Sequence, residues 1–196
     1  MNRLIIIGAG GHGKVIADIA LATGYSDIAF VDDNESIREC AGFPVIGRMS
    51  NLSEIEGDKI VAIGNSYIRE KIMDSIDTVS LIHPGANIGR DVDILPGSVV
   101  MAGAVINHGS KIGRGCIINT CSSVDHDCVL EDYVHVAVGA HLCGSVNIGA
   151  NTWIGSGAIV INNVRIGPDC MIGAGAVVVR DITSPGTYVG MPAKAM

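Results

Sequence analysis

The sequence has few aromatic residues and no excess of positive charge. Aromatic side chains make up 4% of its 196 residues, so large rings do not fill its core. The hydrophobic 48% is carried by small and branched side chains beside 26 glycines, a composition that suits repetitive β structure. The net charge is −7, whereas proteins that bind nucleic acids or anionic membranes usually carry an excess of basic residues, so we expect neither partner.

Long apolar runs and paired cysteines are also missing. No stretch of about 18 apolar residues could span a bilayer. The opening MNRLIIIGAG lacks the long apolar segment and cleavage site of a signal peptide. The six cysteines form no C-x-x-C pair. We therefore expect a protein of the reducing cytoplasm.

A six-residue period fills the second half of the chain. Every sixth residue from Ile82 to Val178 is Ile, Leu or Val, and the column four residues later, from Ala86 to Ile182, has no charged or aromatic member. This pattern is typical of a parallel β-helix shaped as a triangular prism, with aliphatic side chains on the axis and small ones at the corners. Three cysteines in the second column are predicted to be small buried residues: Cys116, Cys128 and Cys170.

The stretch SVDHDCV places His126 between two carboxylates inside this apolar repeat. His126 stands two residues after its aliphatic position, so we expect it to face outward. Residues one coil apart stack about 4.8 Å from each other, which sets Gly144 above His126. For acyl transfer, His126 could act as the general base, Asp127 could orient it, and the Gly144 N–H could stabilise an oxyanion. On spacing alone, a solvated acidic turn remains an equal alternative.

A zinc site is a further alternative, because some hexapeptide β-helices are zinc carbonic anhydrases. The histidines available do not reproduce the close histidine pair of that family: His108, His126, His135 and His141. We expect no metal.

The first 80 residues read as a small α/β domain. A strand over residues 4–7 is followed by Gly8-Ala-Gly-Gly-His-Gly13 and a helical pattern over residues 15–21, which is G-x-G-x-x-G at a strand-to-helix turn. A second strand over residues 28–31 ends in Asp32 and Asp33, placed to bind a ribose or base. Further strands are predicted over residues 60–63 and 78–82, with a helix beginning near Ser66 after Gly64.

This segment has room for one mononucleotide-binding half. A dinucleotide such as NAD needs two halves, so we expect a single nucleoside diphosphate with its phosphates at the N-terminus of the first helix. A glycine turn without a ligand is the alternative.

Over its whole length the chain resembles the bacterial nucleotide-sugar acetyltransferases of the left-handed β-helix family. The resemblance is carried by GxGGHG, by IGN near the end of the small domain, and by NT-S-V-x-H-[DE]-C in the repeats. The bacillosamine-pathway members, which N-acetylate UDP-4-amino-4,6-dideoxy-N-acetylglucosamine, look most similar. The resemblance implies a Rossmann-like half domain (α/β) over residues 1–80 and a left-handed parallel β-helix with a C-terminal cap over residues 81–196.

The same resemblance implies an acetyl-CoA-dependent N-acetyltransferase acting on the 4-amino group of a UDP-linked sugar, working as a homotrimer with sites between subunits. His126 would be the general base, Asp127 its orienting carboxylate and Gly144 the donor to the thioester oxygen. The acetyl-CoA groove would include His135, Ser156 and Ala174. The nucleotide sugar would contact Gly10, Gly11, His12, Asp32, Asp33, Gly64 and Asn119. The tail Gly190-Met-Pro-Ala-Lys194 would approach the coenzyme.

Three other functions remain open at this point. Sialic acid O-acetyltransferases and GDP-perosamine N-acetyltransferases are similar, and the same base and oxyanion donor would serve either reaction. A non-catalytic trimer that binds a sugar nucleotide is the alternative from a different class.

Overall fold

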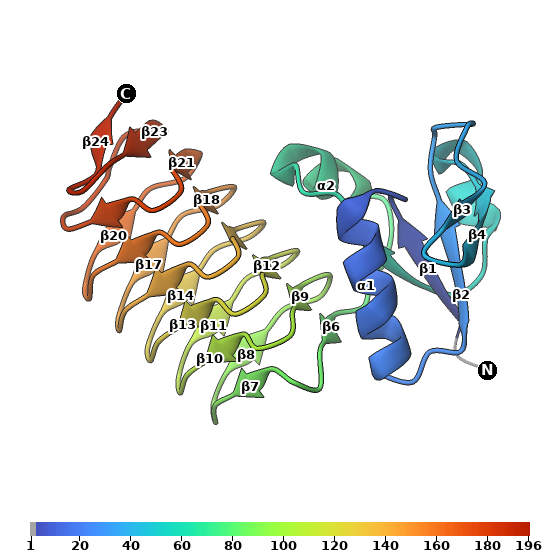
Figure 1. Cartoon of the computed structure of the whole chain (residues 1–196), viewed down its shortest axis with the longest axis horizontal. Helices are drawn as coiled ribbons and strands as arrows, with labels where there is room; N and C mark the ends of the chain where they lie inside the picture. The colour runs from blue at the N-terminus through green and yellow to red at the C-terminus, as the bar shows by residue number, and fades with distance from the viewer. Residues whose placement is uncertain (1–2) are drawn as a thin grey trace.

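The computed structural model describes residues 3–196. Figure 1 shows an N-terminal α/β unit beside a long stack of coils that ends at the C-terminus. We call residues 3–80 the N-terminal unit and the stack from residue 81 onward the β-helix. Within residues 3–196, none of the helices has the length and apolar character needed to cross a membrane.

The N-terminal unit is one twisted sheet with strand order β3-β4-β2-β1-β5. Strands β2 and β5 both pair in parallel with β1, and β4 continues the parallel pairing beyond β2. The elements are β1 (Arg3–Ile7), α1 (Gly11–Ala22), β2 (Asp27–Val31), β3 (Glu39–Cys40), β4 (Phe43–Gly47), the 3-10 helix η1 (Met49–Glu54), β5 (Asp58–Val61) and α2 (Ser66–Met73).

The predicted strands and helices of this unit are confirmed with small shifts. Strand β5 ends at Val61 instead of residue 63, and α1 begins at Gly11, four positions before the apolar pattern that signals it. Of the strand predicted over residues 78–82, only Leu81–Ile82 forms, as β6 of the β-helix. The β3–β4 hairpin was not predicted. Strand β3 has only two residues, and Cys40 is the one buried residue of the hairpin strands, with Phe43 and Val45 half-buried against the core.

The glycines of the strand-to-helix turn are required by the backbone itself. Gly8 has a φ of +109°, in the left-handed region that favours glycine. A Cβ on Gly13 would lie 2.2 Å from the carbonyl oxygen of Gly8. The first and last glycines of the motif therefore make the turn tight and bring α1 close to β1.

The β-helix has three flat faces, each a sheet whose coil strands pair in parallel; only the last strand of face three, β24, pairs antiparallel, with β23. Face one contains β7 (Asn87–Ile88), β10 (Val105–Ile106), β13 (Ser123–Val124), β16 (His141–Leu142), β19 (Ile159–Val160) and β22 (Val177–Val178). Face two contains β8 (Asp93–Ile94), β11 (Lys111–Ile112), β14 (Val129–Leu130), β17 (Asn147–Ile148) and β20 (Arg165–Ile166). Face three contains β6 (Leu81–Ile82), β9 (Val99–Val100), β12 (Ile117–Ile118), β15 (His135–Val136), β18 (Trp153–Ile154), β21 (Cys170–Ile172), β23 (Gly186–Val189) and β24 (Lys194–Ala195).

The predicted register of the β-helix is confirmed. Ile106 pairs with Val124 and Val124 with Leu142, so aliphatic residues stack coil upon coil and form one continuous core. The column is less buried only at its start, where Ile82 is 37% exposed, because the first coil is the open end of the prism.

The small-residue column lies buried at the corners, and its hydroxyl groups are all paired. Ser98, Ser110 and Thr152 each donate a hydrogen bond to a backbone carbonyl of the same corner one coil later, at 2.7 to 2.9 Å. The three cysteines of this column are buried as predicted: Cys116, Cys128 and Cys170. Desolvation raises the pKa of the Cys116 thiol to about 12, which fits a packing role.

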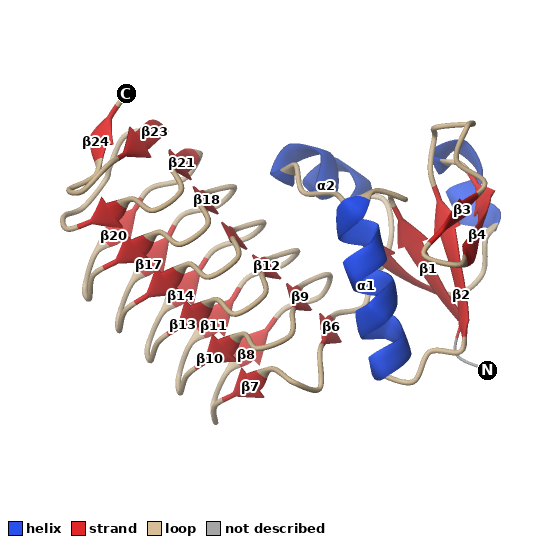
Figure 2. Ribbon diagram, in the orientation of Figure 1, coloured by secondary structure: helices blue, strands red, loops and turns tan. Residues whose placement is uncertain are grey.

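The two units share a hydrophobic core. Helix α1 lies between its own sheet and the β-helix (Figure 2), and its apolar residues Ile16 and Ile19 cluster with Leu81, Val99 and Ile117 of face three. The N-terminal unit therefore packs on face three, and α2 extends along the corner between faces two and three, where Tyr67 Oη donates to Asp169 at 2.9 Å. Faces one and two stay uncovered.

A fully buried arginine joins the two units. Arg69 of α2 donates from Nε to the Gly115 carbonyl at 2.7 Å and from one Nη to the Tyr133 carbonyl at 2.9 Å, both in the β-helix. Its other Nη donates to the Ile63 and Gly64 carbonyls of the N-terminal unit, at 2.8 and 3.0 Å. Desolvation lowers its pKa to about 10, so the guanidinium stays charged at neutral pH. Within residues 3–196 no carboxylate forms an ion pair with it; carbonyl oxygens alone hold it.

We predict that Arg69→Met strongly destabilises the protein, because four carbonyls, two of them in buried residues and two in half-buried ones, lose their donor. Each such loss costs about 1–3 kcal/mol, so the free energy of unfolding should fall by at least ~3 kcal/mol in urea titrations. The control is Arg48→Met, which removes an exposed ion pair with Glu35 (2.7 Å) and should cost at most about 1 kcal/mol. Equal effects of the two substitutions would contradict this role.

Candidate functional site

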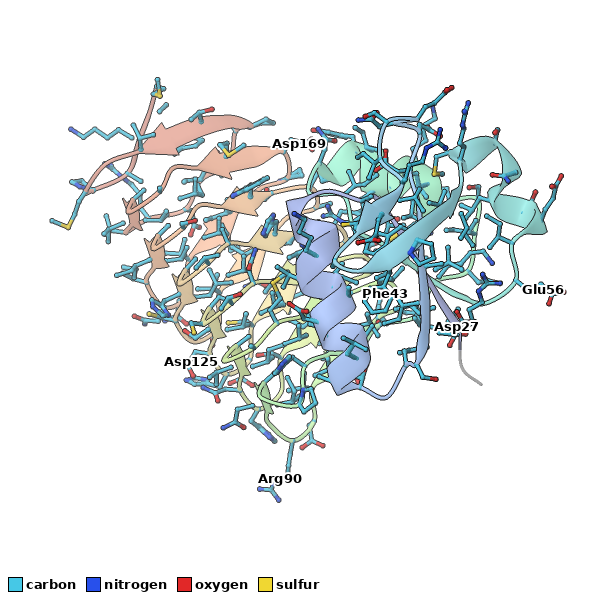
Figure 3. The ribbon with its side chains drawn as sticks, turned by 45° about the vertical axis from the view of Figure 1, so that its right-hand side comes forward. Asp27, Phe43, Glu56, Arg90, Asp125 and Asp169 are labelled. Carbon is cyan, nitrogen blue, oxygen red and sulfur yellow. The ribbon has the colours of Figure 1, made fainter. Side chains whose placement is uncertain are left out.

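His126 and Asp127 form a hydrogen-bonded pair on the corner between faces one and two, which we call the 1–2 corner. His126 Nδ1 lies 2.8 Å from Asp127 Oδ2, and the two side chains are 57% and 62% exposed. His126 therefore faces outward, as predicted. Figure 3 labels the neighbouring Asp125 on the side of the β-helix that is turned away from the N-terminal sheet.

The corner that carries this pair is pinned by the preceding coil. Asp125 accepts hydrogen bonds from Asn107 Nδ2 at 2.8 Å and from its neighbour's backbone, His126 N–H, at 2.9 Å. Below it, Ser110 Oγ donates to the Asp125 carbonyl at 2.7 Å. The backbone under His126 is thus held by side chains from one coil earlier.

Asp127 changes the chemistry of His126. Its hydrogen bond, together with the negative charges of Asp125 and Asp127, raises the pKa of His126, while desolvation opposes the rise. When the imidazole is neutral, the bond to Asp127 keeps the proton on Nδ1 and leaves the Nε2 lone pair free. This is the protonation state that a general base needs.

Gly144 leaves room for the imidazole ring. A Cβ at this position would lie 2.5 Å from His126 Nε2, so the ring rests directly against the backbone of the next coil. Within residues 3–196, the Gly144 N–H donates to no protein acceptor. A free N–H beside the reactive nitrogen is the arrangement that could stabilise an oxyanion.

The N-terminus of α1 is open. A Cβ on Gly10 or Gly11 would meet nothing within 4 Å, no side chain caps the helix, and its first turn has no acidic residue. The free N–H groups and the helix dipole could therefore receive an anion.

The two aspartates after β2 already hold loop amides. Asp32 accepts from the Ala9 and Asn34 N–H groups at 2.7 and 2.8 Å, and Asp33 accepts from the Met49 N–H at 2.9 Å. Asp32 thereby ties the glycine loop to the end of β2. Gly64 contributes its carbonyl to Arg69.

Two further predicted residues meet between the two units. Among residues 3–196, the buried Nε2 of His12 and Nδ1 of His135 have no hydrogen-bond partner. Desolvation, with the nearby positive charge of Arg69, lowers the pKa of His12 to about 4 and that of His135 to about 3, so both are neutral. The His135 ring lies 4.3 Å from Trp153, centroid to centroid.

Asn119 fixes the tautomer of His135. Its Oδ1 accepts from the Thr120 N–H at 2.8 Å, which directs its amide N–H₂ to His135 Nε2 at 3.0 Å. His135 Nε2 must then be the unprotonated nitrogen, so Nδ1 carries the proton. His135 is 7% exposed and thus presents a buried donor instead of an open groove wall.

The predicted residues fall on two different corners of the prism. Ser156 and Ala174 are exposed on the corner between faces three and one, the 3–1 corner, which also carries Asn119. His126 lies on the 1–2 corner, across face one from them. A single chain therefore does not bring His126 together with these residues. No three His, Cys, Asp or Glu side chains among residues 3–196 are grouped to hold a metal ion.

Sequence reasoning missed several residues that shape these sites, above all Arg69, Asn107 and Trp153. The Asn107–Asp125 contact was readable, because the two residues occupy the same hexad position one coil apart. Arg69 gave no signal, because its role depends on how the two units pack.

Two family models match the chain. The PglD N-terminal domain matches residues 3–76, and the bacterial transferase hexapeptide model (six repeats) matches residues 145–180. A GDP-perosamine N-acetyltransferase of Escherichia coli O157:H7 is 32% identical over 173 residues, 81% of this chain and 78% of that protein. The UDP-N-acetylbacillosamine N-acetyltransferase of Bacillus subtilis is 34% identical over 114 residues, and this match spans about half (52%) of each protein.

Solved structures agree over the whole chain. The acetyltransferase domain of PglB from Neisseria gonorrhoeae, in complex with acetyl coenzyme A, is 43% identical, covers 100% of both chains and has a TM-score of 0.96. The PerB structure from Caulobacter crescentus, with CoA and GDP-perosamine, is 38% identical, covers 100% of this chain and 98% of that one, and has a TM-score of 0.93. The expected fold class, a Rossmann-like half domain followed by a left-handed β-helix of hexapeptide repeats, is thereby confirmed.

We predict that Asp127→Asn lowers the pKa of His126, because the hydrogen bond loses its negatively charged acceptor. Asparagine fits the left-handed backbone at this corner, as Asn163 does two coils later (φ +62°). An NMR titration of the histidine rings measures the pKa directly. Asp91→Asn, at the same corner of an earlier coil, is the control and should leave the pKa of His126 unchanged; an unshifted pKa in Asp127→Asn would refute the assignment.

Proposed function

Because the chain belongs to the hexapeptide-repeat family of bacterial nucleotide-sugar N-acetyltransferases, we propose that it transfers the acetyl group of acetyl-CoA to the 4-amino group of a UDP-linked amino sugar. The observation that carries this proposal is the exposed His126–Asp127 pair, with Nδ1 bound at 2.8 Å and Nε2 free beneath Gly144 of the next coil. The chemistry of a neutral imidazole held by a carboxylate is that of a general base.

The proposed reaction is a direct attack. The amine nitrogen of the sugar attacks the thioester carbonyl carbon, a C–N bond forms, and the C–S bond to coenzyme A breaks. His126 Nε2 takes the proton that the amine loses, and the resulting imidazolium is stabilised by Asp127. The departing sulfur of coenzyme A takes up that proton and leaves as the thiol, which restores the neutral imidazole. The thioester oxygen, negative in the tetrahedral intermediate, accepts from the Gly144 N–H.

The open N-terminus of α1 supports the proposed position of the substrate diphosphate. Its free N–H groups would bind the phosphates, with Gly10, Gly11 and His12 lining the site. Asp33, one of whose carboxylate oxygens accepts from Met49, keeps the other for a ribose or base. Asp32 would act mainly by shaping the loop, since both of its oxygens hold backbone amides.

The separation of His126 on the 1–2 corner from Ser156 and Ala174 on the 3–1 corner supports a homotrimer. The outward side chains of face one include no Asp, Glu, Lys or Arg, namely Asn87, Val105, Ser123, His141, Ile159 and Val177, whereas face two presents Asp93, Lys111 and Arg165. A face without acidic residues, lysine or arginine is the better one to bury against other copies. With face one turned to the trimer axis, His126 of one copy would lie beside the 3–1 corner of the next, with acetyl-CoA between them along Ser156 and Ala174.

A GDP-linked 4-amino sugar is the second candidate substrate, favoured by the similarity to perosamine N-acetyltransferases. The two candidate substrates would react identically at the amine. They differ in the nucleobase, uracil or guanine, which the N-terminal unit would bind. Sugar nucleotides and acetyl-CoA are available in the cytoplasm, which is where we propose that the enzyme works.

The proposal is tested by release of free coenzyme A thiol in the presence of UDP-, GDP- and CMP-linked amino and hydroxy sugars. We expect turnover with a UDP-4-amino sugar and at least a ~100-fold loss of kcat in His126→Gln. His108→Gln, an exposed histidine one coil earlier, is the matched control and should keep full activity. Unchanged turnover in His126→Gln would remove His126 as the base, and activity only with hydroxy sugars would replace N- by O-acetylation.

Mixed trimers test whether each site spans two subunits. Co-expressed His126→Gln and Ser156→Trp chains carry defects on different corners, so a random mixture should regain about a quarter of wild-type activity. His126→Gln mixed with Gly144→Ala, whose defects share the 1–2 corner, should regain none. Equal failure of both mixtures, with trimers verified by sedimentation, would place each site within one chain.

A further inference from the structure

Gly109 lies directly beneath the carboxylate of Asp127. It occupies the 1–2 corner one coil earlier, and a Cβ built on it would lie 2.9 Å from Asp127 Oδ1. The next nearest atom is Asp127 Cγ at 3.9 Å, so no other residue crowds this position. We propose that Gly109 is a positioning residue, whose missing side chain leaves the space from which Asp127 holds His126. This inference rests on the proposed function for its catalytic meaning.

The backbone does not explain the glycine. Gly109 has a φ of +73°, but the residues at the same corner position of four other coils adopt the same left-handed conformation with side chains: Asp91 at +56°, Asp127 at +58°, Ser145 at +60° and Asn163 at +62°. The corner therefore accepts aspartate, serine and asparagine. What distinguishes position 109 is the carboxylate above it.

The His126–Asp127 pair lies between two glycines, Gly109 and Gly144. Gly144, one coil later, leaves room for the imidazole, and Gly109, one coil earlier, leaves room for the carboxylate. Both close approaches involve the ends of the two side chains, the imidazole nitrogen Nε2 and the carboxylate oxygen Oδ1. The pair is thus positioned from both sides by the coils that stack on it.

A methyl group at position 109 would meet only the end of a flexible side chain, so the fold could keep its shape while the carboxylate moves. Moving Oδ1 by rotation of the carboxyl group also moves Oδ2, which makes the 2.8 Å bond to His126 Nδ1. The charged groups that act on His126 are Asp127 and Asp125, and only Asp127 would be displaced. The effect should therefore appear at His126, although Gly109 does not touch it.

The test is Gly109→Ala compared with Gly139→Ala. Gly139 lies on the 3–1 corner with a φ of +63° and nothing within 4 Å of its Cβ, so it matches the backbone strain without the contact. We expect an NMR titration to show a lower pKa for His126 in Gly109→Ala and an unchanged one in Gly139→Ala. We also expect kcat to fall about tenfold in Gly109→Ala with the KM for acetyl-CoA unchanged, as befits a group that acts through a general base.

An unchanged pKa for His126 in folded Gly109→Ala would overturn the proposal, and so would equal shifts in the two variants. If Gly109→Ala does not fold, Gly109→Asn decides in the same way, since Asn163 shows that the corner accepts this residue. The titration needs no turnover. A wild-type protein without acetyl transfer would therefore refute the proposed function while leaving this contact measurable.

Discussion

The stacking of one coil on the next is the constraint on which the molecule depends. Each coil hydrogen-bonds to its neighbour through parallel backbone ladders, such as Asp125 N–H to the Leu142 carbonyl at 2.9 Å. Since the repeat never slips, residues one coil apart along the chain are neighbours in space. The close approaches of Gly109 to Asp127, of Asn107 to Asp125 and of Gly144 to His126 all arise from this regularity. A rigid prism therefore supplies the preorganisation that a loop would have to obtain from other contacts.

Placement of the N-terminal unit depends on a different kind of interaction. Arg69 reaches from α2 to carbonyls on both sides of the junction, beside the apolar contact of α1 with face three. Backbone carbonyls are fixed points, so an arginine that binds four of them permits little relative motion. The open end of α1 and the buried His12 and His135 are thus held in one geometry.

The sequence was most informative where a local period determines the structure. The hexad predicted the register of the β-helix, the buried cysteines and the outward direction of His126. It could not predict the burial of His135, because that position faces outward in the repeat and is covered only when the N-terminal unit packs on face three. For the same reason, nothing in the pattern indicated Arg69. The two aspartates after β2 were predicted for the ligand, but they also bind loop amides, and these contacts depend on a turn and a helix outside the strand pattern.

The unneutralised guanidinium of Arg69 has an electrostatic consequence for a chain that is acidic as a whole. At long range, a net charge of −7 repels any phosphorylated molecule. Close to α1, desolvation and then the buried positive charge of Arg69 lower the pKa of His12, so this charge acts on the end of the helix. Salt screens the diffuse outer repulsion far more than this buried charge. Rising ionic strength should therefore weaken the repulsion between the acidic protein and a phosphorylated molecule, while the attraction of the phosphates to the buried Arg69 charge persists. A binding site made of exposed lysines and arginines would show the reverse.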